Sequence, residues 1–474
     1  MTKAIARIVS VSLPIVLLAV LGAQAQITLL SVGSLDRSRA GVLTDLSGLT
    51  DTLENGAHAS LLGGFGSAIT YAGGSAFLAL PDRGPNAISY DSNLDDTASY
   101  INRFHTINFE LSPKNGGLGS PFTLGLSLRS TTLLWSPTPL VYGAGDTKVG
   151  TGAPSLNSSS QYFFTGRSDN FDASQDSGNP NDGRFDTEGI RLSNDGLKVY
   201  ISDEYGPYVY EFDRLTGKRL RSFKFPACDP VTLTGCFFVT NVSSLGNTEI
   251  SGNTFGRTAN KGMEGLAITP DGTTLVGIMQ NALIQDANQG KAQAKLLRIV
   301  TFDIATGVAT HQYGYKLTNG TGVSEILALN NHELLVDERD GKGRGNGDGA
   351  VVKQLFKIDL NGAADISNMD ATTALPHAVN KTLFLDFVQL LSNNGIAPEN
   401  IPAKIEGISF GPDVKQGKIN VHTLWVANDN DFLSTVADAQ GNPIANPNQF
   451  FVVGFTDVDL GGSTYSPQRV MPLF

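Results

Sequence analysis

One hairpin pattern recurs along the chain and constrains its fold more than any other feature. The clearest copy is 186–205, DTEGIRLSNDGLKVYISDEY, in which apolar and polar residues alternate on both sides of the turn Asn194–Gly196. In an antiparallel hairpin the start of the first strand lies beside the end of the second. We therefore expect Glu188 and the exit pair Asp203-Glu204 at the same end of the unit, away from the turn.

The pattern returns with a glutamate at the start of the first strand and polar residues where the second strand ends. These later copies carry Glu264 with exit Gln280-Asn281, Glu325 with exit Asp337-Glu338-Arg339, and Glu406 with exit Asn428-Asp429. A weaker first copy, GGFGSAITYAGGSAFLALPDRGPN, has Gly64 near the glutamate position and exits at Asp82-Arg83. The step from Gly64 to Glu188 is close to twice the other steps, which indicates a degenerate copy near Trp135.

Five visible copies and one hidden copy predict an all-β fold, a β-propeller of six blades around a central channel. Each unit is too small to bury a face alone, and 53 glycines with 17% charged residues suit a turn-rich β chain. We expect one short helical insertion at Leu383–Leu391, and a C-terminal strand, QFFVVGF, that closes the ring beside the N-terminal segment. The glutamate ends of all blades should then meet around one mouth of the channel.

The first 25 residues, Met1–Ala25, have the pattern of a secretory signal peptide, with a basic start, an apolar run and a small-residue cleavage site. A retained membrane anchor is the alternative, which the short apolar run disfavours, and no other stretch is suited to span a membrane. We expect residues 26–474 to form a single secreted or periplasmic domain and a monomer. The net charge of −11 argues against a nucleic-acid partner.

The two cysteines, Cys228 and Cys236, lie in the segment ACDPVTLTGC. In an oxidising compartment we expect them to form a disulfide that closes this short loop. A metal or catalytic role is disfavoured because two ligands are too few and no histidine lies nearby.

The recurring glutamate is the best candidate for chemistry. Carboxylates that converge on one mouth repel one another and raise each other's pKa unless a cation neutralises them. The structural alternative is that each glutamate accepts backbone N–H bonds and locks adjacent blades together. Hard oxygen ligands suit Ca²⁺. The predicted metal ligands are Glu188, Glu264, Glu325, Glu406, Asp82, Asn281, Asp337 and Asp429.

The motifs TEGI, MEGL, SEIL and IEGI, together with GGF…DRGPN and VDERDG, resemble the phytase-like family described as "esterase-like activity of phytase". The resemblance runs from Gly63 to the C-terminus and implies a propeller hydrolase, with phosphoric esters as candidate substrates. The glutamate-glycine strand start is also similar, more distantly, to calcium-dependent lactonase propellers of the gluconolactonase and paraoxonase type, in which such a glutamate binds the metal. Gly64 departs from the acidic residue of the phytase pattern, which leaves the number of ligands open.

Three functions remain open on this evidence. The favoured one is a Ca²⁺-dependent hydrolase of small phosphoric esters, with metal-bound water as the nucleophile. The second is a carboxylic-ester or lactone hydrolase at the same mouth, and the third is a non-catalytic exported propeller that binds a ligand or surface partner. The predicted catalytic residues are Glu188, Glu264, Asp203 and Glu204, and the predicted substrate-binding residues are Arg83, Lys261 and Arg339.

Overall fold

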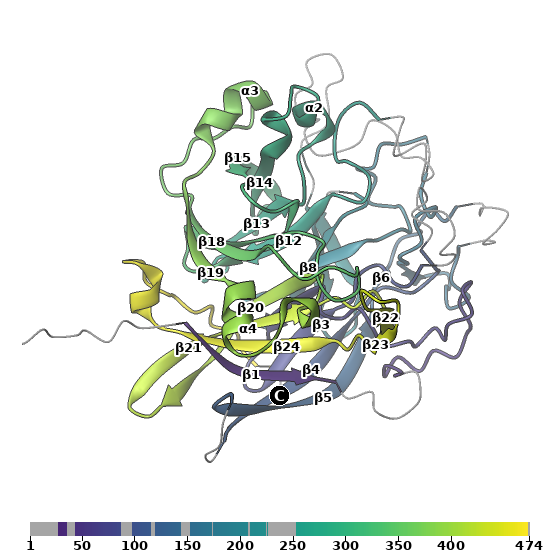
Figure 1. Ribbon diagram of the computed structural model, residues 1–474. Helices are drawn as coiled ribbons and strands as arrows, with labels where there is room; N and C mark the ends of the chain where they lie inside the picture. The colour runs from purple at the N-terminus through teal and green to yellow at the C-terminus, as the bar shows by residue number, and fades with distance from the viewer. Residues whose placement is uncertain are drawn as a thin grey trace, which may run out of the picture.

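The architecture is a ring of five antiparallel four-stranded sheets, seen in a computed structural model (Figure 1). The structure describes residues 27–35, 43–86, 97–114, 119–143, 152–172, 174–206, 209–223, 225 and 253–472. The predicted signal peptide and the predicted disulfide, Cys228 with Cys236, lie outside these residues.

Each sheet is a blade that runs from an inner to an outer strand. Blade 1 contains β2 (Ala68–Tyr71), β3 (Ala76–Leu80), β4 (Arg103–Pro113) and β5 (Phe122–Leu133). Blade 2 contains β8 (Thr187–Leu192), β9 (Lys198–Asp203), β10 (Val209–Asp213) and β11 (Arg219–Phe223). Blade 3 contains β12 (Met263–Ile268), β13 (Thr274–Met279), β14 (Leu296–Asp303) and β15 (Val308–Lys316).

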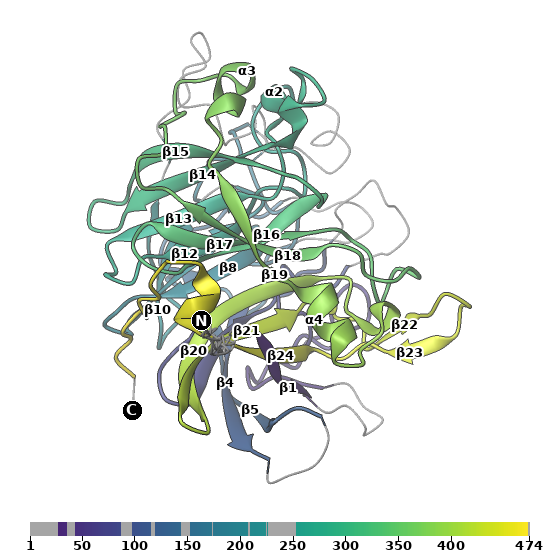
Figure 2. The same cartoon turned by 60° about the vertical axis from the view of Figure 1, so that its left-hand side comes forward.

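Blade 4 contains β16 (Gly322–Ala328), β17 (Glu333–Arg339), β18 (Lys353–Asp359) and β19 (Lys381–Asp386). Blade 5 contains β20 (Ile405–Gln416), β21 (Ile419–Asn428), β24 (Gln449–Phe455) and β1 (Thr28–Ser34). Two small hairpins add β6 (Trp135–Ser136), β7 (Tyr162–Phe163), β22 (Thr435–Ala437) and β23 (Pro443–Ala445). Figure 2 shows the β22–β23 hairpin projecting away from the ring.

The ring closes through both its inner and its outer strands. The inner strands β2, β8, β12, β16 and β20 contact one another in this order, and β20 returns to β2. At the outside, β1 pairs antiparallel with β24, so the two chain ends complete one blade (Figure 1). This pairing confirms the predicted closure: β24 is buried along almost its whole length and pairs with β21 on one side and β1 on the other.

The predicted blade number was wrong, although the propeller class is confirmed. Near Trp135, where a sixth copy was expected, β6 pairs with the two-residue strand β7 and makes one isolated bridge, from Trp135 to Lys218. This stretch lacks the run of alternating apolar residues that an inner strand needs, so β2 packs directly against β8. The doubled spacing between the first two glutamate positions therefore reflects a long insertion, not a blade.

The helical prediction at Leu383–Leu391 was half right. Residues up to Asp386 belong to β19, and the helix α4 (Phe387–Asn393) begins only after Asp386, whose side chain accepts a capping bond from Gln389 N at 2.9 Å. The periodicity misled because strand and helix follow each other without a turn. The other helical turns are α2 (Ile284–Ala287), α3 (Ala371–Ala374), η1 (Gln293–Lys295), η2 (Leu375–His377), η3 (Pro398–Asn400) and η4 (Asp457–Leu460).

The two ends of the channel differ. At one end tight turns join the first and second strand of each blade, and the C-terminal segment crosses them (Figure 2). Gln468 Nε2 donates to Leu192 O at 2.7 Å, and Met471 N donates to Asn194 O at 2.9 Å. A cavity of about 70 Å³ remains beneath it, lined in part by Arg191 and Tyr465. We call this the closed end, and we call the opposite end, where the long connections between second and third strands gather, the mouth.

Candidate metal and substrate site at the mouth

The glutamates reach the mouth because each stands at an irregularity of its strand. Glu188, Glu264 and Glu406 are the second residues of β8, β12 and β20, and the pairing register shifts at each of them. Such bulges redirect a side chain out of the sheet. The glycine that follows is required by close packing, since a Cβ on Gly265 would lie 2.7 Å from Ile326 N of the next blade. The E-G motif therefore follows from bulged inner strands packed tightly in a ring.

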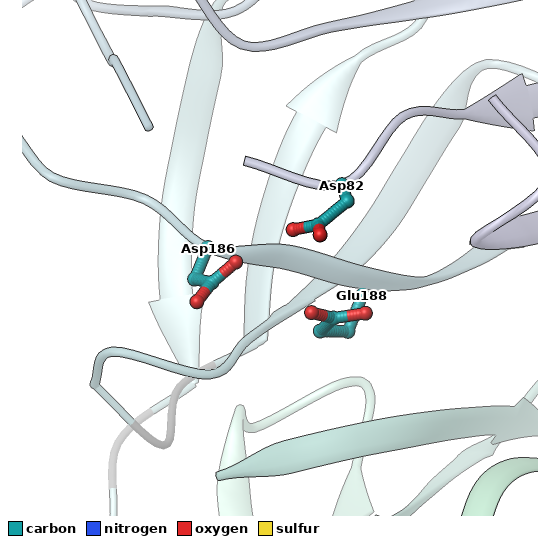
Figure 3. A group of neighbouring side chains, drawn as sticks. All are labelled: Asp82, Asp186 and Glu188. Carbon is teal, nitrogen blue, oxygen red and sulfur yellow. The ribbon is translucent and has the colours of Figure 1, made fainter. Parts of the chain in front are cut away.

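Carboxylates from several blades converge at this end. Asp82, Asp186 and Glu188 offer oxygens that lie within 4.8 Å of one another, and Figure 3 shows the three side chains facing the same space. The same separation holds for the two overlapping groups that share Glu188 or Asp82. These three trios are Asp82–Asp186–Glu188, Glu188–Glu204–Glu264 and Asp82–Asp429–Asp431. Together with Glu406 they form what we call the acidic mouth.

Three cations belong to the acidic mouth, and each is paired with its carboxylates. Arg83 Nη1 lies 3.1 Å from Asp186 Oδ2. Arg339 Nη2 lies 2.5 Å from Glu406 Oε1 and 3.8 Å from Glu264 Oε1. Burial lowers the pKa of Arg339, but Glu406 and Glu264 raise it further, so the guanidinium stays charged. A third cation, Lys404, pairs with Asp429 at 3.0 Å.

The trio Glu188–Glu204–Glu264 is the least compensated of the three. Glu188 accepts a hydrogen bond from Ser67 Oγ at 2.9 Å, and Glu204 accepts one from Gly262 N at 2.9 Å. Glu264 Oε2 is buried and, within the described part of the chain, has no hydrogen-bond partner. An orphaned buried oxygen beside two further carboxylates fits a cation, because uncompensated buried charge is strongly unfavourable.

The pKa shifts of this trio also show that its negative charges are poorly compensated. Burial raises the pKa of Glu188 well above its ordinary value, and the neighbouring Glu264 raises it further. Burial likewise raises the pKa of Glu264, with Glu204 and Glu406 as the next causes. A divalent cation bound among these three carboxylates would stabilise their ionised forms and so lower the pKa values that burial and mutual repulsion raise.

Glu325 belongs to the corresponding motif of blade 4 but lies one residue further along its strand, since it pairs with Asp337 as Gly265 pairs with Ile278, and it has a structural environment there. Its Oε1 accepts from Leu266 N at 2.9 Å, and its Oε2 lies 2.9 Å from Arg191 Nη2. Arg191 also donates to Ile69 O at 3.1 Å and to Ile326 O at 2.9 Å, so it crosses the channel between blades. Glu325 therefore matches the blade-locking alternative, and it does not join the acidic mouth.

The remaining predicted residues do not belong to the three carboxylate trios. Asp203 Oδ1 accepts from Asp186 N at 3.0 Å and holds that backbone, and burial raises the pKa of Asp203 to about 7. The Asn281 amide, in the orientation that satisfies both of its atoms, donates to Thr321 O at 2.8 Å. Lys261 stands at the exposed rim, where its Nζ donates to Gln280 Oε1 at 3.3 Å.

Asp337 lies fully buried below the acidic mouth. Neither of its carboxylate oxygens has a hydrogen-bond partner among the described residues. Burial raises the pKa of Asp337 to about 8, against the opposing effects of Arg339 and Lys353. Its carboxylate belongs to none of the three trios, so Asp337 lies apart from the acidic mouth.

The first copy contributes no glutamate, and its register explains why. Ala68 pairs with Leu80 as Ile190 pairs with Ile201, so the glutamate position falls on Gly66 and not on Gly64 as predicted. A Cβ on Gly66 would lie 2.1 Å from Asn428 O of blade 5. No side chain fits there, and the next residue along, Ser67, instead supports Glu188.

Sequence reasoning missed three residues of the acidic mouth, Asp186, Lys404 and Asp431. Asp186 and Lys404 stand two residues before Glu188 and Glu406, directly ahead of β8 and β20. A charged residue at this fixed distance from the glutamate in two copies is the sequence signal that could have found both. Asp431 follows the exit of blade 5 in a left-handed backbone conformation, φ 51°, which no sequence pattern indicated.

A family model and a curated relative match this chain. The model of the phytase-like family, described as esterase-like activity of phytase, matches residues 60–432. A curated relative from Arthroderma benhamiae, an "uncharacterized secreted protein", is 30% identical over 285 residues, which cover 55% of this chain and 53% of the relative. The chain thus spans about half of that relative's length.

Solved structures show only a distant likeness. A putative 6-phosphogluconolactonase from Bacteroides uniformis is 11% identical, with 81% of this chain and 88% of the other covered and a TM-score of 0.30. A protein of unknown function from Dyadobacter fermentans is 7% identical, with coverage of 90% and 99% and a TM-score of 0.34. Among the residues that the structure describes, no helix has the length and apolar character to cross a membrane.

Proposed function

Because the chain belongs to the phytase-like family, we propose that it is an exported, metal-dependent hydrolase of small anionic esters, with phosphoric esters preferred. The observation that carries the metal is the buried trio Glu188–Glu204–Glu264, in which Glu264 Oε2 has no partner among the described residues. Export is supported by the secretory pattern of the N-terminus and by a relative described as secreted.

The donor set favours Ca²⁺ over a softer metal. All three side chains offer carboxylate oxygens, and no histidine or cysteine belongs to the trio. When bound, Ca²⁺ would neutralise the trio, polarise the ester and lower the pKa of a bound water. Glu188, Glu204 and Glu264 would hold the ion.

The neighbouring cations supply the second part of the site. Arg339 is fixed by Glu406 and by a hydrogen bond to Ser324, and its side chain remains 14% exposed. Arg83 is held between Asp186 and Asn260, and Lys261 follows at the rim. A guanidinium held in place binds an anionic ester group with little loss of entropy. These residues would orient the substrate, whereas burial of the trio excludes bulk water.

A carboxylic-ester or lactone hydrolase is the second candidate, and the charge balance favours it. Among the described residues, the acidic mouth brings eight carboxylates together with Arg83, Arg339 and Lys404, and the buried Arg257 acts on Glu204 and Asp186 from beside it. This excess of negative charge repels a polyanionic substrate unless several metal ions bind. A weakly charged carboxylic ester would meet less repulsion at the same site.

Calorimetric titration of the EDTA-treated protein with Ca²⁺, followed by an ester panel, tests the proposal. The panel contains p-nitrophenyl phosphate, p-nitrophenyl acetate and a γ-lactone, each with and without Ca²⁺. We expect Ca²⁺ binding and Ca²⁺-dependent turnover that Glu264→Gln reduces and Glu110→Gln, an exposed carboxylate on β4, does not. Intact Ca²⁺ binding with no turnover of any ester would favour a non-catalytic ligand-binding propeller.

A further inference from the structure

Lys404 has a position that the proposed chemistry does not use. It directly precedes β20 and stands two residues before Glu406. Its Nζ lies 3.0 Å from Asp429 Oδ2, 2.5 Å from Asp431 Oδ1 and 4.0 Å from Asp82 Oδ2. The ammonium group is thus surrounded by all three members of the trio Asp82–Asp429–Asp431.

This trio and the trio around Glu264 have the same oxygen spacing, since the ligand atoms of each lie within 4.8 Å of one another. The two trios differ in the positive charge that lies among their oxygens. Burial lowers the pKa of Lys404, but Asp429, Asp431 and their acidic neighbours raise it well above its usual value. A permanent positive charge therefore lies among the oxygens of one trio, whereas at the other trio Arg83 and Arg257 act on Glu204 and Arg339 lies 3.8 Å from Glu264 Oε1.

The loop that carries Asp431 is held by a neighbouring blade. Asp431 and Phe432 both have left-handed backbone angles, φ 51° and 57°, which side chains other than glycine rarely adopt. The Phe432 ring packs on Tyr100 at 5.0 Å and covers Gly64, where a Cβ would lie 2.6 Å from the ring. Gly64 N also donates to Asn430 Oδ1 at 2.8 Å. These contacts keep the Asp431 carboxylate beside Lys404.

We infer that Lys404 is a built-in cation that takes the place of a second divalent ion at Asp82–Asp429–Asp431, so the acidic mouth binds one ion beside a fixed positive charge. The inference rests on the proposed function for the ion at the other trio. Two of the three ammonium donors serve Asp429 and Asp431, and the third makes no hydrogen bond to a described residue. This arrangement selects an ester with a single anionic group, placed between the ion and Lys404, over a polyanion that needs several ions.

The experiment is the Ca²⁺ stoichiometry of purified full-length chain, measured by calorimetry. Wild type should bind one ion, and Lys404→Met should bind two, because the substitution removes the charge and shortens the unbranched side chain by one atom. Lys404→Met combined with Asp431→Asn should return to one. Lys342→Met is the matched control, since Lys342 pairs with the exposed Asp348 at 3.6 Å outside the acidic mouth. Its stoichiometry should equal that of wild type.

Two ions in wild type, or a folded Lys404→Met variant that binds no more ions than wild type, would overturn the inference. If wild type binds none and Lys404→Met binds one, the proposed function fails and the role of Lys404 stands. Asp431→Asn alone covers the case in which Lys404→Met does not fold. It should keep one ion, whereas loss of an ion would show that this trio holds metal in wild type and would sink the inference.

Substrate preference gives a second readout at saturating Ca²⁺. Wild type should hydrolyse a phosphate monoester in preference to a bisphosphorylated substrate of similar size. Lys404→Met, with its second ion, should shift kcat/KM toward the bisphosphorylated substrate, and an unchanged ratio would contradict the assigned selectivity.

Discussion

Glu264 and Glu325 belong to the same motif in neighbouring blades, yet Glu325 lies one residue further along its strand, and their surroundings assign them opposite roles. Glu325 has Arg191 and two backbone N–H donors, and it links three inner strands. Glu264 has Arg339 only at 3.8 Å, and one of its oxygens has no partner among the described residues. A buried carboxylate with its own partners stabilises the fold, whereas one without them is prepared for a ligand. Arg191, the partner of Glu325, also lines the cavity at the closed end of the channel, whereas Glu264 belongs to the acidic mouth.

The largest expected effect is that of Glu325→Gln. The substitution leaves Arg191 buried without its carboxylate, and breaking a buried ion pair costs about 3 kcal/mol or more. Urea unfolding should show this loss, with Ca²⁺ affinity of the folded protein nearly unchanged. A stable variant that has lost Ca²⁺ binding would reverse the comparison and make Glu325 a ligand.

Glu264→Gln should have the opposite pattern. Without metal the variant should be as stable as wild type or more stable, because one repelling buried charge is removed. Saturating Ca²⁺, at about 100 times its Kd, should stabilise wild type by roughly 2.7 kcal/mol, and the variant should gain clearly less at the same concentration. Thermal unfolding with and without Ca²⁺ measures both. Equal gains in the two proteins would show that Glu264 is structural.

The pH dependence of metal-free stability tests the buried Asp337. Its folded pKa of about 8 exceeds the value of an unfolded aspartate, so the native state binds more protons across this window. Stability should therefore fall as pH rises from about 4 to 8, by at least about 1 kcal/mol. Asp337→Asn should flatten this slope in urea unfolding at several pH values. An unchanged slope would assign the effect to other groups, such as Glu325 with its pKa near 7.

The smallest expected effect belongs to the closed end. Gln468→Ala removes the hydrogen bonds to Leu192 O and Asn194 Oδ1 and should cost about 1 kcal/mol of stability. Ca²⁺ binding and turnover should not change, because the crossing segment lies at the opposite end of the channel. Altered Ca²⁺ affinity in this variant would show that the two ends are coupled.

The sequence by itself determined the repeated unit and its direction. Alternating apolar residues, turn residues and the glutamate at each strand start specify bulged inner hairpins whose acidic ends meet, and QFFVVGF indicated the strand that completes the ring with β1. These features are local in the chain, so local patterns report them. The same patterns placed Glu188, Glu204 and Glu264 at the mouth.

Only the tertiary structure decided the number of blades and which buried carboxylates have a cationic partner. The ring has five blades and not six because β2 packs directly against β8. The spacing of the motifs along the chain does not reveal that contact. Arg191 meets Glu325, and Lys404 meets Asp82, through ring closure between segments far apart in sequence. Whether a buried charge is compensated depends on such distant partners, because Coulomb interactions and burial act through space and not along the chain.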